Sequence, residues 1–67
     1  MIHLTVNGKS RSLDAPMTLA AFLASLNVPA RLIVVEHNGE ILPRGTYEDV
    51  TLQDGDALEI VRMVGGG

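Results

Sequence analysis

IHLTVNGKSRSLDAPMTLAAFLASL, residues 2–26, is the stretch that decides the fold. Between residues 2 and 6, apolar and polar residues alternate, which is the period of a half-buried strand. Asn7-Gly8 follows directly and indicates a tight hairpin turn, because both residues tolerate positive φ. Lys9–Leu13 is then predicted to be the returning strand, so the chain is expected to begin with a β-hairpin.

A short amphipathic helix is predicted after the hairpin. Thr18 is placed to cap it, because its hydroxyl can accept a hydrogen bond from a free amide of the first turn. Asn27 and Pro29 are expected to end it. One helix face carries four large apolar residues at the spacing i, i+3, i+4, i+7, namely Leu19, Phe22, Leu23 and Leu26.

The rest of the chain predicts further strands separated by turns. A buried strand (Leu32–Val35), a turn (Asn38-Gly39), a short strand (Ile41-Leu42), a loop with one helical turn (Arg44–Leu52), a turn (Asp54-Gly55-Asp56) and a last strand (Ala57–Val64) are expected in that order. We expect the last strand to lie parallel to the first in the sheet centre. The predicted fold is therefore α+β, a mixed four- to five-stranded sheet with one helix packed across it.

Length and composition limit the classes of function that the chain can have. The 67 residues suffice for one domain, expected at residues 1–64, with 65–67 as a flexible glycine tail. The absence of cysteine excludes disulfides, iron–sulfur clusters and thiolate zinc sites. A net charge of −3 argues against binding to nucleic acid or to an anionic membrane. We see no signal peptide in the sequence and expect a cytoplasmic protein.

The terminal glycines are the most informative feature for function. Gly8, Gly39 and Gly55 have a backbone reason for being glycine, because they lie in predicted turns. Residues 65–67 have no such reason, since no further fold follows them. A tail without side chains can enter a narrow channel and present the Gly67 carboxylate to a reactive phosphate in another protein. The competing interpretation is a frayed terminus.

Four stretches resemble the ThiS family of sulfur carriers in thiamin biosynthesis. They are the turn region Val6–Gly8, a middle block at Val35–Arg44, a block before the last strand and within it at Leu52–Val61, and the ending Val64-Gly65-Gly66-Gly67. The similarity covers the whole chain. It implies a β-grasp fold, which is the fold of ubiquitin.

The resemblance also implies a chemistry. An E1-like adenylyltransferase (ThiF) uses ATP and magnesium to adenylate the Gly67 carboxylate, and sulfur from a donor such as a cysteine desulfurase converts it to a thiocarboxylate. Thiazole synthase (ThiG) takes this sulfur for the thiazole ring. Gly65 and Gly66 then thread the partner's active site. The chain itself is implied to be a carrier and not an enzyme, with no catalytic residue and no bound cofactor.

Three alternatives remain open from the residues. The chain could carry sulfur in another pathway, such as molybdopterin synthesis or tRNA thiolation. It could be a ubiquitin-like modifier that forms isopeptide bonds, because the same acyl adenylate would serve that reaction. It could also be an interaction domain with an inert tail.

Other candidate sites are weaker, and one surface merits a prediction. His3 and His37 are too few ligands for a zinc site, so no metal is expected.

Val61 and Met63 alternate with the predicted core residues of the last strand and should face away from the helix. If Ile33 or Val35 joins them, they would form an apolar docking patch for partner enzymes, with Glu59 and Arg62 at its rim.

Overall fold

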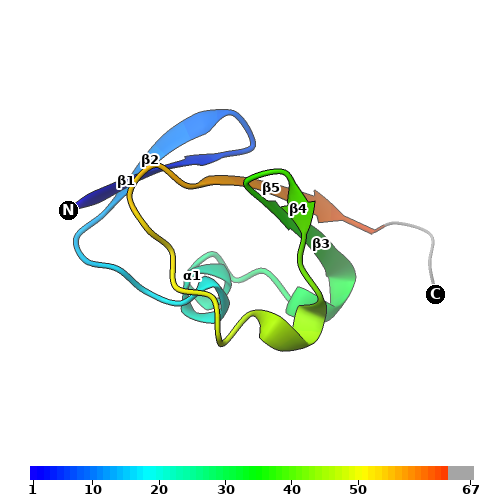
Figure 1. The fold of residues 1–67 in the computed structure, drawn as a ribbon. Helices are drawn as coiled ribbons and strands as arrows, with labels where there is room; N and C mark the ends of the chain where they lie inside the picture. Colours follow the sequence, from blue (N-terminus) through cyan, green and yellow to red (C-terminus); the bar gives the residue numbers. More distant parts are fainter. Residues whose placement is uncertain (64–67) are drawn as a thin grey trace.

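The computed structural model describes residues 1–63 of the chain (Figure 1). Five strands, one α-helix and two short 3-10 helices form in it. In chain order they are β1 (Ile2–Val6), β2 (Lys9–Leu13), α1 (Leu19–Ser25), η1 (Ala30–Leu32), β3 (Ile33–His37), β4 (Glu40–Ile41), η2 (Arg44–Thr46) and β5 (Ala57–Arg62).

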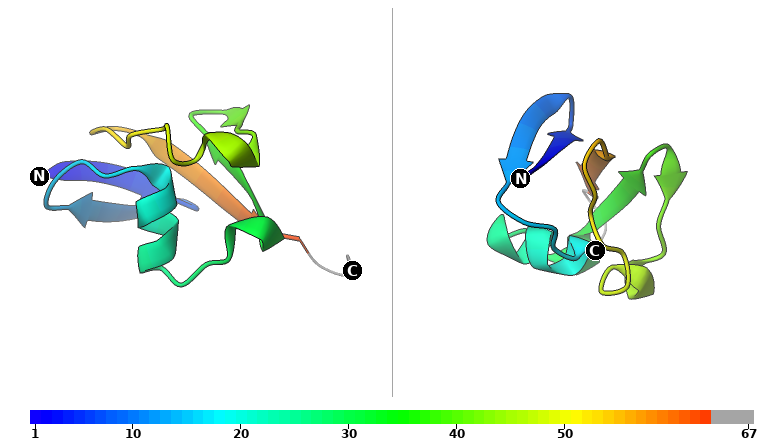
Figure 2. Two further views of the ribbon diagram at one scale, coloured as in Figure 1. Left: turned by 90° about the horizontal axis from the view of Figure 1, so that it is seen from below. Right: turned by 60° about the vertical axis from the view of Figure 1, so that its left-hand side comes forward.

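All five strands join in one mixed sheet, in the order β2-β1-β5-β3-β4. β5 is central and parallel to β1, with Thr5 opposite Ala57 and Val6 opposite Leu58, and it runs antiparallel to β3. This confirms the predicted position and direction of the last strand. Figures 1 and 2 show α1 and both 3-10 helices on one side of the sheet. The fold is the β-grasp arrangement that the resemblance implied.

The predicted turns are confirmed by their backbone angles. Asn7 and Asn38 adopt φ of 51° and 52°, and the glycine after each has φ of 81° and 89°. Two consecutive positive φ values are what a tight hairpin turn between twisted strands requires. The two asparagines therefore do more than interrupt a strand pattern, because they fix the register of both hairpins.

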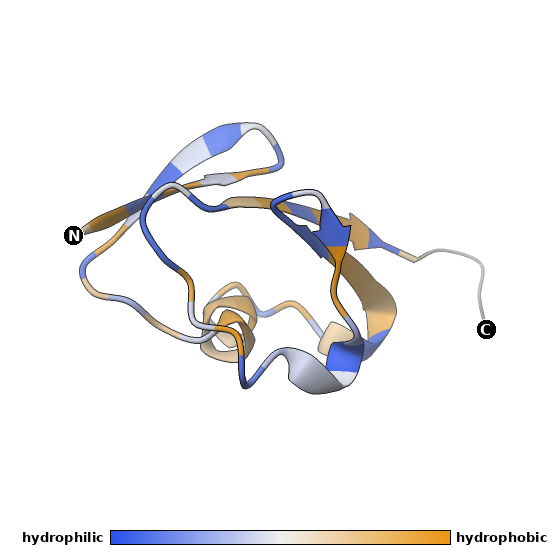
Figure 3. Cartoon of the chain, viewed as in Figure 1, coloured by the Kyte–Doolittle hydropathy of each residue, from blue (hydrophilic) through white to orange (hydrophobic). Residues whose placement is uncertain are grey.

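Helix α1 begins and ends as the sequence predicts. The Thr18 Oγ1 accepts a hydrogen bond from the Ala21 amide at 3.1 Å, which caps the first turn. Asn27 ends the helical course with φ of 59°. The apolar stripe faces the sheet, with Leu19, Phe22 and Leu23 buried and Leu26 half-buried. In Figure 3 the helix is almost uniformly hydrophobic in colour, whereas β2 is polar.

The core extends beyond the predicted helix stripe and strands. Alternate residues of β1, β3 and β5 meet the helix, and Tyr47 and Leu52 complete the core from the long connection between β4 and β5. This connection is tied to the start of the helix, because the Leu19 amide donates to the Val50 carbonyl and the Leu52 amide donates to the Met17 carbonyl, both at 2.8 Å. The sequence pattern predicted a loop here, and the structure shows that the loop covers one side of the core.

The boundaries of three strands differ from the prediction. β3 extends to His37 and not only to Val35, and β4 is Glu40–Ile41 and not Ile41-Leu42. Leu32 lies in η1 and is exposed, so the buried strand begins at Ile33. β5 ends at Arg62, although the Met63 amide still donates to the Leu32 carbonyl at 2.8 Å. Across residues 1–63, no helix has the length and apolar character needed to cross a membrane.

Candidate functional site

The candidate site is the end of β5 together with the face of the sheet that points away from α1. Gly65, Gly66 and Gly67, for which the sequence predicts the chemistry, lie outside the described residues. What the structure shows is the strand that leads to them and the surface beside that strand. Because β5 is central, it pairs with β1 at Ala57 and Leu58 and with β3 from Leu58 to Arg62.

The outer face of the sheet carries a row of apolar side chains. Val61 is 57 % exposed and Met63 is 43 % exposed, which confirms that both face away from the core. Val34 lies directly opposite Val61 on β3, and Ile41 on β4 is exposed on the same face. We call Val34, Ile41, Val61 and Met63 the outer apolar patch. Val34 is half-buried and the other three are exposed, and exposed apolar side chains on one face mark docking surfaces in many proteins.

Ile33 is buried, and Val35 does not belong to this patch either, so the outward position predicted for them is wrong. The Val35 side chain is fully buried, because Val35 pairs with Ile60, whose side chain faces the core. Its neighbour Val34 takes the outward position, since successive side chains of a strand point to opposite faces. Arg62 pairs with Ile33 and is exposed, but it leaves β5 on the helix side of the sheet and not beside Val61.

Two carboxylates border the outer apolar patch. Glu36 of β3 has two cross-strand neighbours, which are Glu59 of β5 and Ile41 of β4. Like charges that face each other across strands are unfavourable in isolation. A partner that brings a cationic side chain to this point would relieve the repulsion, so the outer face is best matched by an apolar surface with a basic group.

Two asparagine side chains hold β5 from opposite sides. Asn7 extends the β1 side of the ladder, because its Oδ1 accepts from the Ile60 amide at 2.7 Å and its Nδ2 donates to the Ile60 carbonyl at 3.2 Å. On the β3 side, the Asn38 Oδ1 accepts from the Ala57 amide at 2.8 Å. These bonds fix the strand that carries the chain toward residue 67, and the sequence signalled the two asparagines only as turn residues.

A small polar network lies where β5 begins. The Asp56 carboxylate accepts hydrogen bonds from the Gln53 amide at 2.9 Å and from the Asn38 Nδ2 at 3.1 Å, and the His37 Nε2 lies 3.0 Å from it. Partial burial acts to raise the pKa of Asp56, but the hydrogen bonds from His37, Gln53 and Asn38 outweigh it, so the pKa lies below its ordinary value.

We therefore expect Asp56 to make stability depend on acid pH. A lowered pKa in the folded state means that the contribution of the carboxylate is complete above its unfolded pKa of about 3.9 and is lost as pH falls below that value. Asp56→Asn should lower the urea midpoint at pH 7 and flatten its decline between neutral and acid pH. Asp49→Asn, at an exposed position, is the control. An unchanged acid slope in Asp56→Asn would contradict this role.

The other histidine lies elsewhere. His3 Nδ1 is 3.4 Å from the exposed Asp54 carboxylate. The pKa of Asp54 lies below its ordinary value, chiefly because the carboxylate accepts a hydrogen bond from the His3 backbone amide at 2.7 Å. The two histidines therefore pair with different aspartates. Among residues 1–63, no three or more side chains of the kinds that bind metals come together.

Similarity to known proteins agrees with this fold and with the sequence blocks. The family model described as the ThiS family matches residues 4–67. The sulfur carrier protein ThiS of Bacillus subtilis is 42% identical over 50 residues, which cover 75% of this chain and 76% of that protein. A thiazole synthase of Paramagnetospirillum magneticum is 47% identical over 66 residues, which cover 98% of this chain and 20% of that protein. The chain thus spans about a fifth of the length of that relative.

A solved structure shows the same architecture. The crystal structure of the thiamine biosynthesis protein (ThiS) from Geobacter metallireducens superposes with a TM-score of 0.86 at 39% identity, and the match covers 98% of this chain and all of that one. The shared fold, the family model through residue 67 and the Bacillus subtilis relative point to one assignment. This chain belongs to the ThiS family.

Proposed function

We propose that the protein is a sulfur carrier of thiamin biosynthesis and that Gly67 bears the sulfur as a thiocarboxylate. The observation that carries the proposal is the family match through residue 67, which includes the three terminal glycines. The chain supplies a carboxylate and a folded surface by which enzymes recognise it. The enzymes supply the catalytic groups.

The proposed chemistry has two steps. The Gly67 carboxylate oxygen attacks the α-phosphorus of ATP, and pyrophosphate leaves, so that a poor electrophile becomes an acyl adenylate. A sulfur nucleophile from the donor then attacks the acyl carbon, and AMP leaves with the electron pair of the broken C–O bond. With the persulfide of a cysteine desulfurase as the nucleophile, the product of this attack is an acyl disulfide. A thiol such as free cysteine completes the step: it attacks the desulfurase sulfur, a mixed disulfide forms as the S–S bond breaks, and the thiocarboxylate leaves with the electron pair. The thiocarboxylate sulfur is a softer and stronger nucleophile than the original oxygen. In the proposal, Mg²⁺ and ATP belong to the E1-like partner, and we expect both proteins to act in the cytoplasm.

A thiazole synthase is the proposed recipient of the sulfur. Relatives of this chain that carry that name include an equivalent of it as a fifth of their length, which supports a close working relationship between the two activities. We propose that the outer apolar patch, with Glu59 and Glu36 beside it, is the surface that the partner enzymes contact. In this proposal Val61, Met63 and Glu59 contact the partner, as the sequence predicts, and the buried Val35 does not. Arg62 points to the helix side of the sheet, so it could contact the same partner only at the end of β5.

Mass spectrometry tests the chemistry directly. Incubation with an E1-like adenylyltransferase, ATP, Mg²⁺ and a cysteine desulfurase with cysteine should give the mass gain of one oxygen-to-sulfur exchange, located in the C-terminal peptide. Omission of ATP is the control. An unchanged mass beside an activating enzyme that modifies a known carrier would overturn the proposal, and conjugates to lysine in cell extract would favour a protein modifier.

The docking role makes a separate prediction. Val61→Glu adds a charge to the outer apolar patch beside Glu59, so we expect thiocarboxylate formation at limiting carrier concentration to fall at least about tenfold, the effect of about 1.4 kcal/mol. The thermal midpoint should barely change, because Val61 is exposed. Ser10→Glu, also exposed on the sheet but in β2, is the matched control. Equal rates for the two variants would remove the patch from the proposal.

A further inference from the structure

A surface cavity of about 450 Å³ lies on the helix side of the sheet, away from the outer apolar patch. It is lined by α1, by the segment that leads into η1, and by η2 with the residues that follow it. Leu23 and Tyr47 form its floor and are 2% and 4% exposed. The cavity exists because the residues around this floor are small, among them Ala20, Ala24, Ala30 and Gly45.

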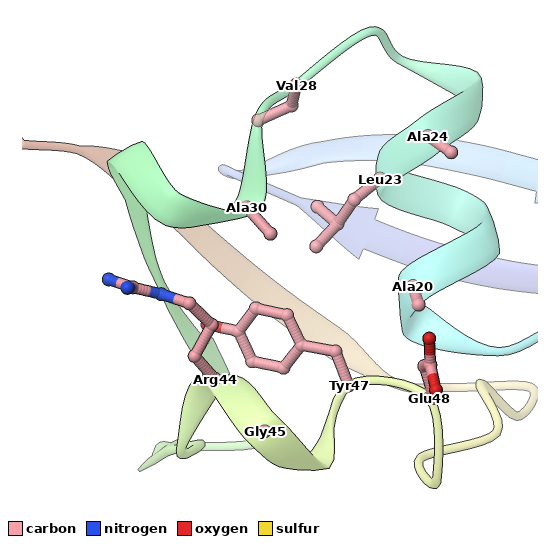
Figure 4. Close-up of a pocket in the computed structure, with 9 residues that line it drawn as sticks. All are labelled: Ala20, Leu23, Ala24, Val28, Ala30, Arg44, Gly45, Tyr47 and Glu48. Atoms are coloured by element: carbon pink, nitrogen blue, oxygen red, sulfur yellow. The ribbon is translucent and has the colours of Figure 1, made fainter.

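Opposite charges stand at the two ends of this cavity. Figure 4 shows the Arg44 guanidinium at one end of the Tyr47 ring and the Glu48 carboxylate at the other end, near Ala20. Neither side chain takes part in an ion pair within residues 1–63, where the two ion pairs join His3 to Asp54 and His37 to Asp56. Both are exposed, so their full charge is available to a ligand.

The shape of the cavity favours a protein partner. Ala24, Arg44, Gly45 and Glu48 are exposed, so a small molecule in this cavity would remain partly in water, whereas enclosed ligand sites bury most of their ligand. A single large side chain that projects from a protein surface is covered by its own neighbours. Such an anchor in a small apolar pocket with a polar rim is the usual energetic centre of a protein interface.

We propose that this cavity receives one large apolar side chain of a partner protein, flanked in that partner by an acidic group that meets Arg44 and a basic group that meets Glu48. The charge pattern of the cavity selects this arrangement, because a partner with two groups of one sign would face repulsion at one end. The site lies across the sheet from the outer apolar patch. One protein can therefore hold the helix side while another occupies the outer face.

Amide chemical shifts measured by NMR with defined peptides test this proposal. The acetylated and amidated peptide Glu-Ala-Leu-Ala-Lys should shift the amides of Leu23, Ala24 and Tyr47 and leave those of Val61 and Met63 unchanged. Replacement of its leucine by serine should abolish the shifts. Replacement of either charged residue by glutamine should weaken binding up to about fivefold, the effect of an exposed ion pair.

Variants of the chain give matched controls. Ala24→Leu fills the cavity and should abolish binding, whereas Ala21→Leu adds the same volume at another exposed position of α1 and should not. Arg44→Glu should shift the preference to Lys-Ala-Leu-Ala-Lys, while Arg31→Glu, which makes the same change in net charge outside the cavity, should not.

Three outcomes would overturn the proposal. They are the absence of shifts at the cavity, equal binding by the leucine and serine peptides, and cavity shifts that grow with protein concentration alone, which would assign the site to a second copy of this chain. None of these measurements involves sulfur or ATP. A failure here therefore leaves the proposed carrier function untouched, and the reverse also holds.

Discussion

Removal of Gly67, or addition of one alanine after it, is expected to abolish thiocarboxylate formation while the thermal midpoint stays nearly unchanged. The proposed reaction needs a carboxylate at one fixed distance from the folded domain, and either change displaces it by a full residue of about 3.3–3.6 Å. The described buried core lies between Ile2 and Leu58, so the cost in stability should be well under 1 kcal/mol. Intact mass after reaction with the activating enzyme and thermal unfolding by circular dichroism measure the two effects.

An alanine added before Met1 is the matched control for this experiment. It changes the length of the chain equally but leaves the C-terminal carboxylate in place, so it should accept sulfur at the normal rate. A chain extended after Gly67 that still gains the mass of sulfur would show that the position of the carboxylate is not decisive. A large fall in the midpoint on deletion of Gly67 would show that the residue contributes to the fold.

Leu58→Ala is expected to unfold most of the protein near room temperature. Leu58 is fully buried on the central strand, directly under the helix stripe. Truncation of such a leucine costs about 2–5 kcal/mol. A domain of this size rarely has more than about 3–5 kcal/mol of stability in total. Urea unfolding followed by circular dichroism should show a midpoint near zero or a partly unfolded baseline.

Val61→Ala lies on the same strand and provides the control. Val61 is on the outer face and more than half exposed, so its truncation should cost only a few tenths of a kcal/mol. Ile60→Ala should fall between the two, because Ile60 is only half-buried against the core. A loss for Leu58→Ala no larger than that for Val61→Ala would mean that the sheet does not pack on the helix as described.

The local elements of the fold could be predicted from the sequence because their signals are local. Alternation in residues 2–6, Asn-Gly at both hairpins and the helix stripe each depend on residues close in the chain. The parallel pairing of β1 with β5 followed from a general preference, the right-handed return through a helix. These predictions concern which elements form, and the structure confirms them.

The contributions of the long connection and of the apolar run could not be predicted in the same way. Residues 44–52 have no period, so nothing local indicates that Tyr47 and Leu52 are buried by contacts with a helix about 25 residues earlier in the chain. In the run Leu32–Val35 every residue is apolar, so alternation cannot distinguish the two faces. Only the register with β5, where Val34 meets Val61, shows that Val34 and not Val35 faces outward.

In the candidate site, too, features that belong to one segment could be predicted from the sequence, and features made by several segments could not. The glycine ending and the outward direction of Val61 and Met63 were visible in the sequence, because each belongs to one segment. The cavity was not, because Ala24, Arg44 and Glu48 come from segments that only the tertiary fold brings together. The hydrogen bonds of Asn7 and Asn38 to β5 were missed for the same reason.

The central place of β5 has a consequence for biosynthesis. Within this domain β1 is made before the other strands, yet its parallel partner is made after nearly all of the other described residues. Until β5 emerges, β1 and β3 have no strand between them, and the apolar side chains destined for the core remain exposed to water. The domain must therefore wait to fold until β5 is free of the exit tunnel, and its folding rate is limited by the closure of the long loop between β1 and β5.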